Sequence, residues 1–415
     1  MAESNPSPRI FLSAGEASGD FYGAQIITEM RARLPQLTCF GLGGVEMAAA
    51  GLDRIVRAED VAHMGITEVI RHMPHIYGEY RRLVASIKKR RPDIAVLIDF
   101  PDVNFRLARE LRKLNVPVVY FVSPQLWAWK RRRLRWVQQR VSRMMVIFPF
   151  EEHFYRARKV DATFVGHPLA QLPLPDITRA EYAEKYMLDP AKNWIALLPG
   201  SRRKEVKLNL PEMLHAASIL NAQGRYEFII PVASTVNNSY ILNFLQDPIY
   251  YSVKPKVTLV DDAREALHHA RASVVASGTA TVQATVIGNP FVVVYRVSPF
   301  TFALARRLVR YPIEIPAEKD QDGNLPIAMV NLVAGKRIVP ELLQTRFTAE
   351  NVAATLTPLL ADGAEREQML SDLAEAHFKL LPASGTGSIS HVCDAVETLL
   401  REGSAASGRI STASV

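Results

Sequence analysis

Short apolar runs rich in valine, isoleucine and leucine alternate along the chain with longer amphipathic stretches. This alternation is typical of parallel β-sheets covered by helices. In the first half, the predicted strands are RIFLSA, LTCFGLG, IAVLIDF, VPVVYFV, RMMVIFPF and ATFVGH, with helices over 21–34, 75–90, 104–113 and 151–158. In the second half, the predicted strands are WIALLPGS, RYEFIIPVAS, KVTLVDD, ASVVASG and PFVVVYRV. From about residue 349 onwards the pattern predicts only helices.

The pattern stops at 168–190, a stretch rich in proline and polar residues that suits an interdomain linker, and then begins again. We therefore expect two doubly wound, Rossmann-like α/β domains that face each other across a cleft. The expected parts are a disordered N-terminus at 1–8, an N-terminal domain at 9–175, a C-terminal domain at 190–365, helices at 366–402 that pack back on the N-terminal domain, and a disordered tail at 403–415. A single large α/β sheet is the alternative.

Length and composition fit a two-domain protein of the cytoplasm. The chain has 415 residues, of which 48% are hydrophobic and 22% charged, as in ordinary soluble proteins. Cys39 and Cys393 lie far apart and form no metal-binding or redox spacing, which fits a reducing compartment. The start, MAESNPSP, lacks the features of a secretory signal, and no apolar run approaches the roughly 20 residues of a membrane-spanning helix.

The formal net charge of +8 indicates anionic partners. Nucleic acid, phosphorylated metabolites and acidic lipids all qualify, and composition does not choose among them.

One basic loop, LLPGSRRKEV, follows a predicted strand and opens a helix. A helix start disfavours cations by about 0.3–1 kcal/mol each, so Arg202, Arg203 and Lys204 together indicate a bound anion such as a phosphate or diphosphate. Ser201 is the expected helix cap. A capped helix with a solvated basic first turn is the alternative. The predicted ligand-binding residues of this loop are Gly200, Ser201, Arg202, Arg203 and Glu205.

A second loop, ASGTATVQAT, repeats this arrangement of strand, small residues and helix. Ser277, Gly278 and Thr279 offer backbone and hydroxyl donors to phosphate, and Gln283 is one turn into the helix, where it could reach ribose hydroxyls. A plain helix cap is the alternative. The two loops together predict that the second domain binds a nucleoside diphosphate.

Carboxylates follow two strands of the first domain. Asp99 ends a buried strand in LIDFPDVN and is the predicted proton acceptor, while Asp102 is the expected helix cap. The loop SAGEASGD contributes Glu16 and Asp20, one of which could instead bind the start of its helix. Small residues in this loop would let a ligand approach the backbone; the predicted binding residues are Ser13, Gly15, Ser18 and Gly19.

Several common site patterns are missing from the sequence. It contains no G-x-x-x-x-G-K-[ST] loop, no G-x-S-x-G elbow and no group of His, Cys and Asp with metal-ligand spacing. We therefore predict no metal and no cofactor.

These motifs, in this order, resemble the lipid-A-disaccharide synthase family. The resemblance rests on SAGEASGD, MGITEVI, IDFPDVN, YFVSPQLWAWK, FPFEEHFY, FVGHPLA, LLPGSRRKEV, ASGTA, PFTFALARRLV and NLVAGKRIVPELLQ, from residue 10 to about 346. SAGEASGD together with SPQLWAW is highly specific, because neither belongs to generic nucleotide-binding loops. The family has the two-domain glycosyltransferase B fold, which agrees with the two predicted sheets.

The resemblance implies a reaction and roles for particular residues. A 2,3-diacylglucosamine unit would pass from its UDP-activated form to 2,3-diacylglucosamine 1-phosphate (lipid X), with inversion, a β-1′,6 linkage and release of UDP. By motif position, Asp99 matches the proposed general base and Arg202 an arginine needed for activity. Glu16 lies in the family's essential first loop, and Asn331 matches a nucleotide-side asparagine. Two features depart from the pattern: Gln283 stands where a carboxylate is expected, and segment 310–331 is longer and more polar than usual.

Diacylated substrates imply contact with the inner face of the cytoplasmic membrane. The stretch MGITEVIRHMPHIYGEYRRL joins apolar residues to arginines, which suits peripheral docking on an anionic bilayer. The predicted docking residues are Ile66, Val69, Ile70, Met73 and Ile76. Packing in the core of the first domain is an equally good interpretation of these residues.

Other functions and assemblies stay open. The arginine run in WAWKRRRLRWVQQR, interleaved with tryptophans, would suit a nucleic-acid-binding protein, although we expect no nucleic-acid partner because that function leaves both phosphate loops and Asp99 unexplained. Another UDP-sugar enzyme, such as a transferase with a soluble acceptor or a UDP-N-acetylglucosamine epimerase, is the nearer alternative. The C-terminal helices could form a homodimer.

Overall fold

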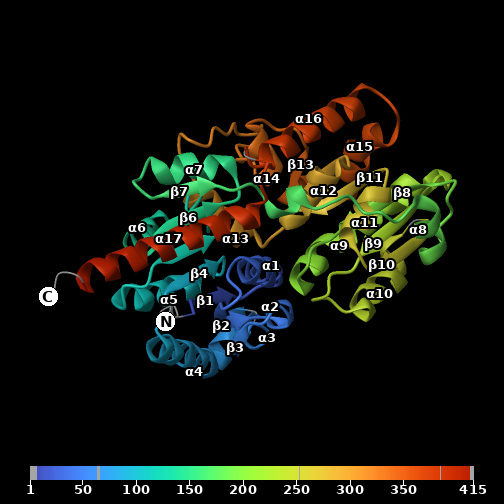
Figure 1. Ribbon diagram of the computed structural model, residues 1–415. Helices are drawn as coiled ribbons and strands as arrows, with labels where there is room; N and C mark the ends of the chain where they lie inside the picture. The colour runs from blue at the N-terminus through green and yellow to red at the C-terminus, as the bar shows by residue number, and fades with distance from the viewer. Residues whose placement is uncertain (1–6, 63–65, 252, 384, 412–415) are drawn as a thin grey trace. The chain divides into compact units, whose positions relative to one another are not determined.

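The computed structural model describes residues 7–62, 66–251, 253–383 and 385–411, and for 61–62, 66–73, 223 and 404–411 it describes the backbone alone. The chain forms two compact units, one of Met1–Pro168 with Leu381–Val415 and the other of Leu169–Leu380. Each unit contains a parallel sheet with helices against it (Figure 1). The predicted pair of doubly wound α/β sheets is therefore confirmed, and the single large sheet is excluded.

The first unit is built on a seven-stranded sheet in the order β3-β2-β1-β4-β5-β6-β7. Its strands are β1 (Arg9–Ala14), β2 (Thr38–Gly43), β3 (Asp53–Arg57), β4 (Ile94–Ile98), β5 (Val118–Phe121), β6 (Arg143–Val146) and β7 (Ala162–Phe164). Its helices are α1 (Ala17–Arg33), α2 (Val45–Ala49), α3 (Glu59–Ala62), α4 (Ile66–Arg90), α5 (Pro101–Lys113), η1 (Arg131–Arg133), α6 (Leu134–Arg140), α7 (Pro149–Arg156) and α17 (Ser388–Ser411).

The second unit repeats the order in six strands, β10-β9-β8-β11-β12-β13. Its strands are β8 (Asn193–Leu198), β9 (Tyr226–Pro231), β10 (Val257–Val260), β11 (Ala272–Ala276), β12 (Phe291–Tyr295) and β13 (Glu341–Leu343). Its helices are α8 (Arg179–Tyr186), α9 (Arg203–Leu220), η3 (Asn221–Gln223), α10 (Asn238–Gln246), η4 (Pro248–Tyr250), α11 (Ala263–His269), α12 (Thr279–Ile287), α13 (Pro299–Leu308), α14 (Met329–Ala334), η5 (Gln344–Arg346), α15 (Ala349–Leu360) and α16 (Ala364–Leu380); η2 (Pro168–Gln171) lies at the boundary of the units.

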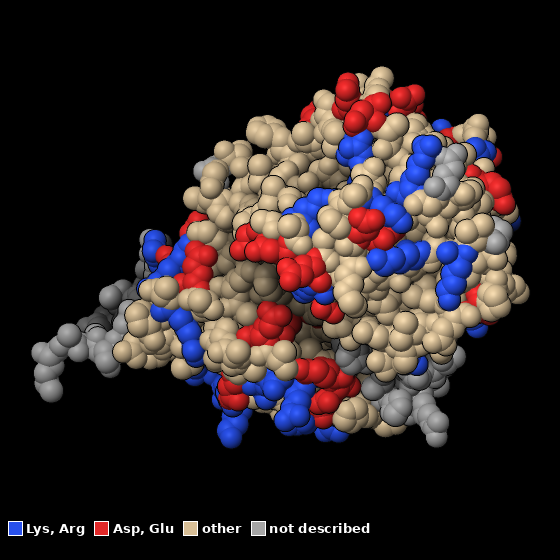
Figure 2. Space-filling model, turned by 90° about the vertical axis from the view of Figure 1, so that its right-hand side faces the viewer, with Lys and Arg blue, Asp and Glu red and all other residues tan. Residues whose placement is uncertain are grey.

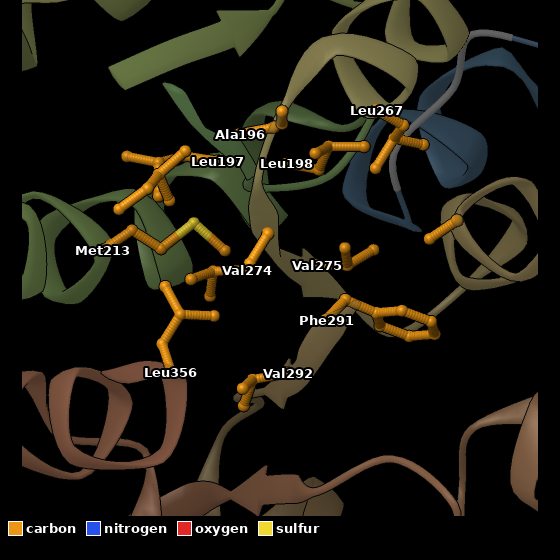
Figure 3. Close-up of a cluster of buried hydrophobic side chains, with 14 of the residues drawn as sticks. Ala196, Leu197, Leu198, Met213, Leu267, Val274, Val275, Phe291, Val292 and Leu356 are labelled. Carbon is orange, nitrogen blue, oxygen red and sulfur yellow. The ribbon is translucent and has the colours of Figure 1, made fainter. Parts of the chain in front are cut away.

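Burial of the strands in the two cores explains why they appear in the sequence as continuous apolar runs. Parallel strands covered on both faces are buried throughout, so β4 and β11 have no exposed position. In the second unit, Leu197 of β8, Met213 of α9, Val274 of β11 and Leu356 of α15 belong to one buried cluster (Figure 3). The sequence analysis missed β3 and β13, because each is a short edge strand with few buried positions.

The C-terminal helices divide between the units. Helix α16 packs with α12, α14 and α15 of the second unit, which extends to Leu380 rather than to the expected 365. Helix α17 packs on α1, where Arg33 donates to Asp394 Oδ1 at 2.6 Å and to Ser390 Oγ at 2.7 Å. Helix α17 also continues to Ser411, through much of the tail that was expected to be disordered.

Helix α4 begins at Ile66, nine residues before the predicted start, and contains Pro74. The side chains of the predicted docking residues Ile66, Val69, Ile70 and Met73 lie outside the described residues. Ile76 is half-buried, and the neighbouring Tyr77 is exposed. Within the described part of the chain, no helix has the length and apolar character needed to cross a bilayer.

Basic and acidic side chains are intermixed on the face shown in Figure 2. Several basic side chains of the second unit form ion pairs, such as Arg337 with Glu341 at 2.7 Å and Lys336 with Asp372 at 2.8 Å.

Candidate functional site

The two strand orders place the predicted loops at equivalent positions. In each sheet the order reverses beside the first strand, between β1 and β4 in the first unit and between β8 and β11 in the second. Ligands of doubly wound sheets bind outside the carboxyl ends of the strands at this switch point. The loops SAGEASGD and DFPDVN follow β1 and β4, and PGSRRKEV and SGTATV follow β8 and β11. Each unit thus has one candidate half-site at its switch point.

In the first unit, the loops after β1 and β4 touch directly. Ala14 pairs with Ile98, so the two strands end side by side. A Cβ atom added to Gly15 would lie 2.5 Å from the ring of Phe100, so only glycine leaves room for that ring. Asp99 and Phe100 both have left-handed backbones, with φ of 44° and 47°. Consecutive non-glycine residues in this region are strained, and such strain is concentrated at functional sites.

A buried hydrogen-bond network holds the Asp99 backbone in this conformation. Asn104 Nδ2 donates to the Asp99 carbonyl at 2.7 Å, and the Tyr120 hydroxyl donates to the same oxygen at 2.6 Å. Ser13 Oγ donates to Asn104 Oδ1 at 2.7 Å. The predicted ligand contact of Ser13 is therefore corrected: its hydroxyl is buried and positions Asn104. The sequence analysis assigned no role to Asn104 or to Tyr120.

The Asp99 carboxyl has the properties of a proton acceptor near neutral pH. Burial raises its pKa to about 6, the negative charge of Glu16 adds to the rise, and a backbone hydrogen bond from Phe100 opposes it. Burial, with a contribution from the charge of Asp99, also raises the pKa of Tyr22 to about 12. Glu16 is exposed at the N-cap of α1, so this site pairs an exposed carboxylate with a half-buried one.

This raised pKa predicts a dependence of stability on pH. Between an unfolded value near 3.8 and the folded value of about 6, only the native state keeps the Asp99 proton, so this group's contribution to stability falls as pH rises through that window. Asp99→Asn removes the cost of the buried charge. We expect the variant to be more stable than the wild type by about 1–3 kcal/mol at pH 8, with the difference vanishing near pH 4, in urea unfolding at both pH values. An equal difference at both pH values would contradict this account.

The other carboxylates of this half-site have structural partners. Asp20 accepts hydrogen bonds from the backbone N–H groups of Gly44, Glu46 and Met47 at 2.7–3.1 Å, so it caps α2 rather than its own helix. Asp102 is not the cap of α5, which is Phe100; it lies in the first turn and pairs with Arg133 at 2.6 Å. The remaining predicted binding residues, Ser18 and Gly19, are in the first turn of α1, the serine exposed and the glycine buried.

We expect Gly15→Ala to destabilise the protein by about 1–3 kcal/mol, because the methyl group must displace the Phe100 ring. Gly78→Ala is the matched control: Gly78 lies in α4, and a Cβ added there meets nothing within 4 Å. That substitution should stabilise the protein by about 0.5–1 kcal/mol. Thermal unfolding of both variants measures the contrast, and equal melting temperatures would show that Gly15 and Phe100 are not tightly packed.

Buried tryptophan and acid from the SPQLWAW and FPFEEH motifs support the same edge of the sheet. Trp127 Nε1 donates to Glu151 Oε1 at 3.1 Å. Burial raises the pKa of Glu151 to about 8, against the effect of the hydrogen bonds that it accepts. Trp127 is therefore a core residue. The tryptophans that alternate with arginines in this segment do not form a continuous row of exposed aromatic rings.

In the second unit, the loop after β8 presents an exposed arginine at the start of a long helix. Arg202 is the N-cap residue of α9, and its side chain is 71% exposed. The expected capping role of Ser201 is wrong: its carbonyl accepts a hydrogen bond from Thr235 Oγ1 instead. Arg203 lies over the ring of Tyr240, 5.3 Å from its centre. The loop thus directs Arg202 into solvent while Arg203 packs locally.

Glu205 folds back over the start of its own helix. Its Oε2 accepts from the N–H groups of Ser201 at 3.1 Å and Arg202 at 3.3 Å. Gly200, with φ of 119°, leaves the space for this carboxylate, since a Cβ there would lie 2.6 Å from Oε2. Glu205 therefore organises the loop, and its predicted contact with a ligand stays a prediction.

The loop after β11 leaves its small residues accessible. Gly278 is the N-cap of α12, and both it and Thr279 are exposed. Ser277 is half-buried and donates its N–H to the Val294 carbonyl. Gln283 is half-buried one turn further along α12. Thr281 Oγ1 donates to the Gly278 carbonyl at 2.7 Å, which fixes the turn.

Asn331 is buried and fully bonded within the protein. Its Oδ1 accepts from the N–H groups of Ile338 and Val339, and its Nδ2 donates to the Val339 carbonyl and to Glu341 Oε1 at 2.9 Å. An amide side chain has two donors and two acceptor sites, so none is left for a ligand. The predicted nucleotide contact of Asn331 is therefore corrected to a structural role at the start of β13.

Among the described residues, the structure contains no group of three or more His, Cys, Asp or Glu side chains placed to hold a metal ion. The exposed groups that an anionic ligand could contact include the side chains of Arg202, Arg203 and Lys204 and the turn at Gly278 and Thr279. These groups of the second unit could neutralise a diphosphate, and the Asp99 carboxyl of the first unit could, by itself, accept a proton.

Comparison with known proteins gives one consistent family. A model of the family described as lipid-A-disaccharide synthetase matches residues 10–385. The chain is 52% identical over 410 residues to the lipid-A-disaccharide synthase of Acidobacterium capsulatum, covering 97% of this chain and 98% of that protein. It is 40% identical over 401 residues to the lipid-A-disaccharide synthase of Myxococcus xanthus, covering 96% and 99%.

Solved structures share the fold at low identity. The complex of S. aureus MnaA with UDP has a TM-score of 0.62 at 11% identity and covers 95% of this chain and 97% of its own. The calicheamicin glycosyltransferase CalG4 has a TM-score of 0.57 at 15% identity, with coverage of 95% and 99%. These likenesses show the two-domain glycosyltransferase B fold.

Proposed function

The chain belongs to the lipid-A-disaccharide synthase family, and from this premise we propose that it transfers 2,3-diacylglucosamine from UDP-2,3-diacylglucosamine to the 6-hydroxyl of lipid X. It is a glycosyltransferase, so a UDP-sugar donor and a lipid acceptor are its substrates. The products would be the β-1′,6-linked disaccharide 1-phosphate and UDP.

Asp99 is the proposed general base, and its environment is the observation that carries the proposal. Inverting transfer is a single displacement in which the acceptor hydroxyl loses its proton as the bond to UDP breaks. A base with a pKa near 6 is charged at neutral pH and still basic enough to take that proton. The backbone bonds from Asn104 and Tyr120 to its carbonyl fix where this carboxyl stands. Glu16, exposed beside it, would hold sugar hydroxyls.

Arg202 and the start of α9 are the proposed site of the diphosphate. The guanidinium is exposed and matches the geometry of phosphate oxygens, and it would stabilise the charge that grows on UDP as it leaves. Ser277, Gly278, Thr279 and Gln283 would hold the nucleotide from the loop after β11. Glu205 keeps the backbone of the arginine loop in place.

Peripheral attachment to the cytoplasmic face of the inner membrane is part of the same proposal, since both sugars carry acyl chains. Segment 66–76, at the start of α4, is the proposed docking element, and the exposed side chain of Tyr77, which directly follows it, supports this proposal.

Formation of the disaccharide tests the function directly. Radiolabelled lipid X and UDP-2,3-diacylglucosamine are incubated with purified protein in detergent micelles, with and without a chelator. We expect a labelled disaccharide in both samples, because the cationic loop can neutralise the diphosphate without an added divalent ion. Absence of product with authentic substrates would refute the function.

An epimerase is the second candidate, because UDP-N-acetylglucosamine 2-epimerases share this fold. Incubation with UDP-N-acetylglucosamine alone separates the two functions. We expect no change in that nucleotide sugar, and formation of its 2-epimer would favour the epimerase.

A further inference from the structure

Helix α13 carries several large apolar side chains that are exposed rather than packed against its own unit. Phe300, Leu304 and Leu308 are 79%, 46% and 56% exposed, and Ile313, just after the helix, is 94% exposed. No residue of α13 is buried. Single exposed apolar residues are common, but a run of four within 14 residues marks an interaction surface.

The exposed residues share one side of the helix. Phe300, Leu304 and Leu308 are spaced by four, so they lie on the same face. Phe302 and Ala305, which are half-buried, take the opposite side, toward the unit. The helix therefore packs on the unit through Phe302 and Ala305, and its larger apolar face is exposed to solvent.

Three arginines, Arg306, Arg307 and Arg310, lie in the segment that carries this face, and residues 299–313 contain no aspartate or glutamate. Arg307 adjoins Leu308 of the face, whereas Arg306 is four residues after Phe302, on the side of the helix toward the unit, and Glu314 directly follows Ile313. Arg306 and Arg307 are exposed, and Arg306 Nη2 contacts only a backbone carbonyl, that of Asp322 at 3.3 Å, among the contacts described for it. Phenylalanine and leucine beside arginine are the side chains of helices that lie in the interface of an anionic bilayer.

Helix α13 also lies on the ligand side of its sheet. It follows the carboxyl end of β12, and β12 pairs with β11, whose own carboxyl end carries the Gly278 turn. Burial raises the pKa of Tyr295, at the end of β12, and the charge of Glu205 in the arginine loop adds to the rise. A partner that binds α13 would therefore lie at the same edge of the second sheet as the predicted nucleotide-binding loops.

We propose that α13, with Ile313, is a docking surface for an anionic lipid bilayer on the second unit, separate from segment 66–76 of the first. This inference rests on the proposed function for its purpose: a donor with two acyl chains must be drawn from a bilayer to the nucleotide loops. A second copy of the chain fits the surface less well, because an isologous dimer through this face would bring the arginines of both copies together.

The test compares two matched triple variants of the full-length protein. Phe300→Ser, Leu304→Ser and Leu308→Ser remove the apolar face of α13. The control changes three exposed apolar residues elsewhere in the same unit, Leu242→Ser, Ile249→Ser and Val253→Ser. Each protein is sedimented with vesicles of phosphatidylethanolamine and phosphatidylglycerol, with vesicles of phosphatidylcholine alone for comparison, and is assayed for disaccharide formation in detergent micelles.

We expect the α13 variant to bind the anionic vesicles at least about tenfold more weakly than the wild type and the control variant, with unchanged activity in micelles. Arg306→Gln with Arg307→Gln should weaken the same binding and remove its salt dependence, which gives a second test if the serine variant does not fold. Equal vesicle binding by the wild type and both α13 variants would overturn the proposal.

Light scattering measures the oligomeric state and so tests whether a second copy of the chain, rather than a bilayer, covers this face. If the wild type is a dimer and the α13 serine variant a monomer with unchanged vesicle binding, the surface is an interface between copies and the proposal is wrong. The micelle assay reports on the proposed function alone. If the α13 variants lose vesicle binding but the wild type forms no disaccharide, the proposed function is refuted, while the proposal that α13 binds lipid still holds.

Discussion

Replacing Asp99 with asparagine is expected to reduce kcat by about 10²–10⁴-fold and to leave the affinity for UDP unchanged. The amide keeps the size of the side chain and leaves the backbone carbonyl free to accept from Asn104 and Tyr120, so the geometry of the loop survives. It cannot accept the proton of the acceptor hydroxyl. Initial rates of disaccharide formation and calorimetric titration with UDP measure the two effects separately.

Asp102→Asn is the matched control for this variant, because Asp102 belongs to the same motif but is exposed and paired with Arg133. Its turnover should stay within about threefold of the wild type, since an exposed ion pair contributes little. For the wild type, kcat/KM should fall about tenfold per pH unit below the pKa of about 6, as Asp99 becomes protonated. An Asp99→Asn protein that loses UDP binding, or that retains wild-type turnover, would remove Asp99 from the role of base.

The sequence was sufficient to predict which loops stand at the carboxyl ends of the strands. Parallel strands buried on both faces read as unbroken apolar runs, and the polar residues that follow them necessarily stand at the carboxyl edge of a sheet. Asp99 and Arg202 follow such runs, at the ends of β4 and β8. Strand order did not need to be known for this, although the structure shows that both residues also flank a switch point.

The hydrogen-bond partners within each half-site could not be predicted in the same way. Asp20 and Asn331 bind groups that lie 24 and 10 positions away at the ends of other elements, and such pairings depend on how the elements pack. Ser13 and Glu205 are polar residues in ligand-binding motifs, yet each is used by a neighbouring part of the protein. Residue type and place in a motif therefore indicate a candidate ligand-binding loop, but not which of its polar atoms remain available.

Arg202 differs from these residues, because its guanidinium is largely exposed and remains available to a ligand. We expect Arg202→Ala to weaken UDP binding by about 10–100-fold and to lower kcat by about 10²–10³-fold, since the arginine would bind the diphosphate and also stabilise the charge on the leaving group. Stability should change by less than about 0.5 kcal/mol, because the contact with Glu205 is long, at 3.4 Å, and exposed. Calorimetry with UDP, initial rates and thermal unfolding measure the three quantities.

Two further variants show whether the position or only the charge of Arg202 matters. Arg225 is an exposed arginine that precedes β9, at the opposite edge of the same sheet, so Arg225→Ala removes the same net charge far from the nucleotide loops. It should bind UDP as the wild type does. Arg202→Lys keeps the charge but loses the two-pronged geometry, so it should recover part of the UDP affinity and little of kcat. Equal losses in the two alanine variants would mean that UDP responds to overall charge, whereas unchanged binding and turnover in Arg202→Ala would show that the diphosphate lies elsewhere.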